Sequence, residues 1–181
     1  MQPYRVRHCE TGGFMVNLEQ CAIIIRQICD ATEPGKKMVQ KLFYLMERKG
    51  LKLNLAYSIH FFGPYSAKLD TALHTLESMG SIEIDTSGMT HIIREGKNMT
   101  GAALNTTDSS VVNYVLDNFL GKTALELEAL TTLDYAATTI LKGKCSDEDI
   151  INEVVKIKGE KFPREYLSRE LVTLKQTGYI Q

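Results

Sequence analysis

Two stretches of the chain, Leu76-Glu-Ser-Met-Gly80-Ser-Ile82 and Leu174-Lys-Gln-Thr-Gly178-Tyr-Ile180, follow the same pattern. In each, a leucine-spaced helix stops at a glycine, which tolerates the left-handed conformation past a helix end, and a strand-forming isoleucine follows two positions later. The leucines also match upstream at equal offsets: Leu69, Leu73 and Leu76 in the first copy, and Leu167, Leu171 and Leu174 in the second. We therefore expect one helix-to-strand unit to occur twice in this chain.

Three helices and a hairpin are expected around the first copy. Two helices with an apolar stripe are predicted within 18–50, and a third over 66–79. Residues 51–61 alternate between apolar and polar, which predicts a strand with one buried face that ends at the Phe62-Gly63-Pro64 corner. Two short strands within 81–94 are predicted to pair as a β-hairpin.

The second copy closes a longer helical region. Residues 96–110 are small and polar, which predicts a linker. Residues 111–181 then contain four helical segments, because their apolar residues recur at helical spacing. Capping boxes that begin at Thr123 and Ser146 predict where two of these helices start.

This order of elements predicts an α+β, mostly α fold with two winged-helix-like units. The first unit, 18–95, is expected to hold a three-stranded sheet. The second unit, 111–181, is expected to have a truncated wing that stops at Gln181. Residues 1–17 are expected to form a leader before the first unit.

Composition restricts the class of protein. The chain holds 21 Lys and Arg residues against 22 Asp and Glu residues, which argues against a broad non-specific grip on nucleic acid and leaves a local patch open. Its four cysteines show no CxxC pair and no zinc-ligand spacing. No signal peptide or membrane-spanning stretch is visible in the sequence, so we expect a cytoplasmic protein without membrane contact.

The sequence shows no catalytic constellation. Gly121-Lys122-Thr123 resembles the end of a phosphate-binding loop, but Leu116 stands where that motif needs glycine. The four histidines have no zinc-ligand spacing, and a structural histidine is the favoured interpretation of His60. We expect a protein that is not an enzyme and that carries no cofactor and no metal.

Two groups of basic residues are candidates for nucleic-acid binding: Lys36, Lys37 and Lys41 in the second expected helix, and Arg164, Arg169 and Lys175 in the last. For the first group we favour a solvated helix face, with a patch for phosphate or an acidic partner as the alternative. The second group would contact the bases and phosphates of DNA. The acidic stretch 108–134 has the opposite sign to the basic run that begins at Lys36, which would dock the two halves or steer dimerisation.

Aromatic residues cluster around the glycine–proline corner. Core packing is the favoured interpretation, because aromatic side chains bury the most area. If part of the cluster is exposed, it is the best candidate for a protein-binding hot spot. The partner-binding candidates are His60, Phe62, Pro64 and Tyr65. Residues 111–141 offer an interface for a homodimer, with packing between the two halves as the alternative.

The segments MVQKLFYLMERKG (38–50) and IHFFGPYSAKLDTALHTLESMGSI (59–82) carry a family resemblance. Through Gln40-Lys41-Leu42, Tyr44 and Gly63-Pro64-Tyr65, they resemble the Panacea domain of SocA-like antitoxins and, more closely, the uncharacterised YwgA-type proteins. The resemblance implies a prokaryotic, cytoplasmic, non-enzymatic protein that neutralises a toxin partner or acts as an adaptor. The sequence therefore favours a protein-interaction module, with a winged-helix DNA-binding transcriptional regulator as the alternative.

Overall fold

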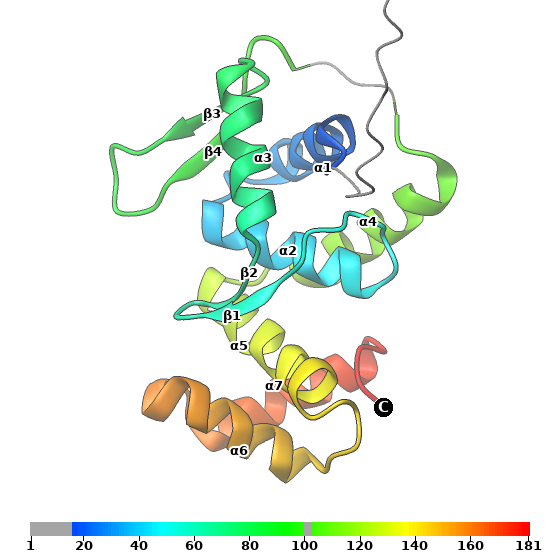
Figure 1. The fold of residues 1–181 in the computed structure, drawn as a ribbon, viewed down its shortest axis with the longest axis vertical. Helices are drawn as coiled ribbons and strands as arrows, with labels where there is room; N and C mark the ends of the chain where they lie inside the picture. The colour runs from blue at the N-terminus through cyan, green and yellow to red at the C-terminus, as the bar shows by residue number, and fades with distance from the viewer. Residues whose placement is uncertain (1–15, 100–102) are drawn as a thin grey trace, which may run out of the picture.

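The structure is a computed structural model, and it describes residues 16–99 and 103–181. These residues form an α+β, mostly helical fold with seven α-helices and two separate two-stranded sheets (Figure 1). The α+β, mostly α class is thus confirmed. The expected leader, 1–17, lies outside the described residues except for its last two. Within the described ranges, every helix is too short or too polar to cross a membrane.

Helices α1 (Leu18–Ala31), α2 (Lys36–Arg48) and α3 (Ala67–Ser78) form the first part of the fold. Local capping defines two of their starts. The Asn17 side chain accepts a hydrogen bond from the backbone of residue 20, and the Ser66 hydroxyl accepts one from the backbone of residue 69. The three helices bury apolar faces in one continuous hydrophobic core.

The predicted strand over 51–61 is largely wrong. Only β1 (Ser58–His60) is a strand, and it pairs with β2 (Gly63–Tyr65), the segment that was expected to end it. Residues 51–56 do alternate between buried and exposed, but Asn54 and Ala56 have positive φ angles of 56° and 53°. The left-handed conformation of these two residues prevents a regular ladder.

The second hairpin is confirmed. Strands β3 (Ile82–Asp85) and β4 (Ile92–Glu95) pair antiparallel and project away from the helices (Figure 1). The three-stranded sheet is not confirmed in the described part of the chain, where each sheet has two strands. A single β-bridge joins Gly35 to Ile92, so the residue next to β4 comes from the turn before α2.

The rest of the chain is helical, as predicted. It contains α4 (Thr106–Phe119), α5 (Ala124–Tyr135), a π-helical turn η1 (Ala136–Ile140), α6 (Asp147–Lys158), a short 3₁₀ turn η2 (Gly159–Lys161) and α7 (Arg164–Gln176). The capping boxes at Thr123 and Ser146 are both present. Because α4 begins at Thr106, the last five residues of the expected linker are helical.

Helix α5 joins the two halves. It runs between α1–α3 and the pair α6–α7 (Figure 1), and it packs against α2, β2, α6 and α7. At the contact with α2, the buried Asp134 carboxylate accepts hydrogen bonds from the Arg48 guanidinium at 2.6 and 3.2 Å and from the Tyr44 hydroxyl at 2.6 Å. The sequence left two roles open for the opposite charges, docking of the two halves and dimerisation. The contact between Arg48 and Asp134 is an example of docking.

The end of α7 is anchored on α2 and α4. The expected terminal strand is absent, because residues 179–181 are described and form no ladder. Instead, the ring of the buried Tyr179 packs edge-on against Phe119 at 5.6 Å, and its hydroxyl donates to the Leu45 carbonyl at 3.0 Å. The Lys49 ammonium caps the helix end by donating to the Thr177 carbonyl at 2.6 Å.

Candidate functional site

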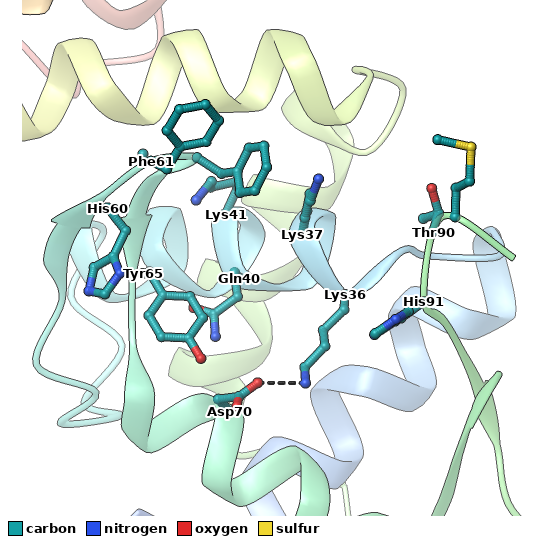
Figure 2. A pocket seen from close by; sticks show the side chains of 13 residues that line it. Lys36, Lys37, Gln40, Lys41, His60, Phe61, Tyr65, Asp70, Thr90 and His91 are labelled. Atoms are coloured by element: carbon teal, nitrogen blue, oxygen red, sulfur yellow. Dashed lines mark ion pairs between the residues drawn. The ribbon is translucent and has the colours of Figure 1, made fainter. Parts of the chain in front are cut away.

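The main candidate site is a pocket of about 410 Å³ that borders both hairpins. Its walls come from the first two turns of α2, the β1–β2 hairpin, the first turn of α3 and the segment just before β4. Figure 2 shows side chains from all four elements around one space. We call it the α2 pocket.

The tip of the β1–β2 hairpin forms one wall of the α2 pocket. The Phe61 and Phe62 rings meet edge-on at 4.9 Å, and the two residues are 80% and 42% exposed. Gly63 places the hairpin against α5: its φ is +85°, and a Cβ there would approach the Thr132 hydroxyl to 2.8 Å. Only glycine fits this position without displacing α5.

Two lysines donate hydrogen bonds to backbone carbonyls of the β1–β2 hairpin. The Lys158 ammonium on α6 donates to the Phe61 carbonyl, and the buried Lys41 ammonium on α2 donates to the Pro64 carbonyl, both at 2.5 Å. These carbonyls flank the hairpin turn, so the tip is fixed from both halves of the molecule. A rigid aromatic tip loses less conformational entropy when it binds a partner than a mobile one does.

Glu128 on α5 forms ion pairs with two lysines beneath the hairpin. Its carboxylate lies 2.9 Å from the Lys158 ammonium and 2.7 Å from that of Lys161. Burial lowers the pKa of Lys41 to about 7; the charge of Glu128 opposes this shift, while the charges of Lys158, Lys37 and Lys161 add to it. The α2 pocket therefore has a local excess of positive charge.

Lysines also lie against the exposed rings. The Lys37 ammonium is 3.6 Å from the centroid of the Phe62 ring, and the Lys161 ammonium is 5.4 Å from the same centroid and 5.8 Å from that of Phe61. Cation–π contacts of this kind are favourable by about 0.5–1 kcal/mol at exposed sites. The tip thus presents aromatic rings between two positive charges.

An ion pair closes the opposite side of the pocket. The Lys36 ammonium lies 2.6 Å from the Asp70 carboxylate, as the dashed line in Figure 2 marks. Partial burial opposes ionisation of Asp70, but its hydrogen bond with Lys36 and the charge of that lysine outweigh the burial and lower its pKa. Burial and the neighbouring Asp70 raise the pKa of Tyr65.

The structure brings the predicted partner-binding residues together. His60, Phe62 and Tyr65 line the α2 pocket, and the His60 and Tyr65 rings are 4.9 Å apart. Pro64 is buried, with its carbonyl turned to Lys41. The expectation that the aromatic cluster is core packing is wrong for the hairpin tip, because the turn lifts both phenylalanines out of the core.

The predicted nucleic-acid residues fall in two separate places. The α2 group, Lys36, Lys37 and Lys41, lines the α2 pocket. The favoured solvated face is wrong for Lys41, which is 3% exposed because the hairpin folds over it.

The α7 group faces other residues of its own half. Arg164 pairs with Glu148 and donates to Asn152 at 2.8 Å, and Lys175 lies 2.7 Å from Asp147. Arg169 lies over the Tyr166 ring at 5.8 Å.

Several site residues were not predicted: Asp70, Glu128, Lys158 and Lys161. The spacing of Lys158 and Lys161 puts them close together, but nothing in the sequence joins them to Glu128, about 30 positions earlier. The described residues contain no group of three or more His, Cys, Asp or Glu side chains arranged to hold a metal. A scan against models of known protein families finds no match to this chain, and a search of curated proteins finds none either.

Proposed function

We propose that this chain is a non-enzymatic protein-interaction module, antitoxin-like or adaptor-like, that docks a protein partner on the tip of the β1–β2 hairpin. The proposal rests on one observation: Phe61 and Phe62 are exposed at 80% and 42% while both sides of their turn are fixed by buried or half-buried lysines. Aromatic residues that are rigid and solvent-exposed are typical anchors of protein interfaces.

The charge around the tip indicates the chemistry of the partner. Lys37 and Lys161 flank the two rings, so a partner segment with apolar and acidic side chains would meet both features. The resemblance of 38–50 and 59–82 to Panacea and YwgA-type proteins supports a toxin, or another client protein, as that partner. We place this function in the prokaryotic cytoplasm, in line with the cysteine usage of the sequence.

The architecture fits this role if each half is a winged-helix-like unit. In the first, α1, α2 and α3 would be the three helices, β3–β4 the wing, and the bridge at Gly35 the remnant of a third strand. In the second, α5, α6 and α7 would be the helices and the residues after α7 a truncated wing. We propose this assignment from the order of the elements and the packing of α5 on α6 and α7.

DNA binding, the alternative, has less support. Arg164 and Lys175 are paired with carboxylates of α6, which neutralises charges that a recognition helix would present to phosphates. Duplex binding that weakens steeply with salt and with Arg169→Ala would favour this alternative over protein docking.

A photocrosslinker placed in the hairpin tests the docking site. The chain would be expressed in cells of its source with p-benzoylphenylalanine at position 61, or at position 172 as the control, since Val172 is also exposed but lies on α7. We expect a discrete protein adduct from position 61, lost on Phe62→Ser, and none from position 172. Equal adducts from both positions, no adduct, or an adduct with nucleic acid would overturn the proposal.

A further inference from the structure

We infer that the α2 pocket is a binding site for a small phosphorylated aromatic molecule, such as a nucleoside phosphate. This inference goes beyond the proposed function and shares Phe61 and Phe62 with it, because these residues line the cavity and also form the hairpin tip. The lining combines lysines with aromatic rings, and Lys37 lies directly against the Phe62 ring.

The lysines of the pocket suit a phosphate group. Three lysines line the pocket, Lys36, Lys37 and Lys41, against a single carboxylate, Asp70. Lys36 is paired with Asp70, but in the described part of the chain neither Lys37 nor Lys41 has a carboxylate within 4 Å. An anion in the pocket would therefore pair with the Lys37 ammonium, and with that of Lys41 when Lys41 is protonated.

The start of α2 adds to this field. Lys36 and Lys37 are the first two residues of the helix, and Gly35 before them contributes no side-chain cap. The Lys36 amide already donates to the His91 carbonyl at 2.8 Å, so it is the positive end of the helix dipole that adds to the field of the lysines.

The aromatic rings of the pocket suit a planar group. Phe61, Phe62 and Tyr65 all line the pocket, and Met89 stands fully exposed at its edge on the β3–β4 hairpin. Aromatic rings and flexible methionines adapt to flat apolar surfaces. A volume of about 410 Å³ lies within the usual range for small-molecule sites.

An anion in the cavity would change the protonation of Lys41. Burial and its lysine neighbours lower the pKa of this ammonium to about 7, so a large fraction is neutral near neutral pH. A phosphate close by would favour the charged form, so its binding would be coupled to proton uptake by the protein.

Titration calorimetry on the full chain would test the inference with three probes: ATP, adenosine and inorganic tripolyphosphate. We expect ATP to bind at least tenfold more tightly than either of the other two, because only ATP engages both the lysines and the aromatic rings. Lys37→Gln, at an exposed position, should weaken ATP binding at least tenfold, and Phe62→Ala should weaken it by a similar factor. Lys175→Gln, far from the pocket on α7, should leave it unchanged.

Three results would overturn the inference. The first is the absence of ATP binding at millimolar concentration. The second is equal binding of ATP and tripolyphosphate, which would reduce the site to a charge effect. The third is unchanged binding in both Lys37→Gln and Phe62→Ala while circular dichroism shows that both are folded. Adducts from position 61 are a separate readout, so the two proposals can fail independently.

Discussion

Helices α3 and α7 end with the same capping but lead into different structures. After α3, the Ser81 amide donates to the Leu76 carbonyl at 2.9 Å, and after α7 the Tyr179 amide donates to the Leu174 carbonyl at 2.9 Å. The glycines at these ends have φ angles of 70° and 65°. The repeated pattern in the sequence thus specifies the same helix stop twice.

Only the end of α3 continues into a strand. The chain after α3 pairs with β4, whereas the chain after α7 packs on α2 and α4 through Tyr179. A strand needs a partner for its backbone groups, and β4 is such a partner for β3, while residues 179–181 have no strand beside them in the described part of the chain. The difference has a consequence for the candidate site, because docking of the second half brings Lys158, Lys161 and Glu128 under the β1–β2 hairpin.

The largest effect on stability is expected from a substitution that breaks the contact between the two halves. Asp134→Ala leaves the Arg48 guanidinium half-buried and the Tyr44 hydroxyl unpaired, which should lower the free energy of unfolding by about 4 kcal/mol. Urea unfolding measures it. Asp147→Ala, which removes an exposed partner of Lys175, is the control and should hardly change the midpoint. A small effect at Asp134 would mean that the halves are held elsewhere.

The next largest effect is expected from substitutions of Tyr179, which anchors the end of α7. Tyr179→Ala loses a buried ring and should cost about 3 kcal/mol. Tyr179→Phe keeps the ring and loses only the hydrogen bond to the Leu45 carbonyl, so it should cost about 1 kcal/mol. Thermal and urea unfolding of the two variants would separate these contributions. Equal costs would contradict the role that we assign to the ring.

The pH dependence of stability reports on Lys41 under the hairpin. Its folded pKa of about 7 lies below the ordinary value of 10.5, so the folded state binds this proton less tightly than the unfolded chain. Burial of the Lys41 ammonium therefore destabilises the folded state fully below pH 7, and this destabilisation decreases as pH rises toward 10.5. Relative to Lys41→Met, the wild type should therefore gain up to about 1.4 kcal/mol per pH unit between about pH 7 and 9. Unfolding at several pH values measures this difference, and a constant difference would show that Lys41 keeps an ordinary pKa.

The smallest effects on stability are expected from substitutions of Gly80 and Gly178, the glycines at the ends of α3 and α7. Alanine at either position places a side chain in the left-handed region, at a cost of about 1 kcal/mol. Gly80→Ala should cost more than Gly178→Ala, because its Cβ would lie 2.8 Å from the Asn98 amide nitrogen, whereas the nearest atom at Gly178 is the Lys49 ammonium at 3.4 Å. Matched melting curves test the order. The reverse order would indicate that the capping of Gly178 by Lys49 is the more sensitive of the two.

Local features of this fold were predictable from sequence, and long-range ones were not. The helix stops at Gly80 and Gly178 and the capping boxes at Thr123 and Ser146 depend on residues a few positions apart, which a sequence pattern records. The ladder over 51–61 failed because Asn54 turns into the left-handed region while burial still alternates.

The candidate site was predictable only in part. The aromatic corner and the α2 lysines were found, because they are close in sequence and chemically distinctive. The burial of Lys41 depends on the hairpin that folds over it, and the Glu128 cluster depends on α5 and α6 meeting beneath that hairpin. Both are tertiary contacts of charged side chains with residues far away in sequence, and such contacts have no periodic signature in the chain.

The central claim is that the two helix ends belong to one cooperative body, in which docking of the second half supports the β1–β2 hairpin that forms one wall of the α2 pocket. Hydrogen exchange in increasing urea, followed on peptides from α3 and from α7, tests this claim most directly. We predict that both peptides lose protection at the same urea concentration in the wild type, and that α7 loses it first in Tyr179→Ala. Loss of protection in α7 well before α3 in the wild type would contradict the claim.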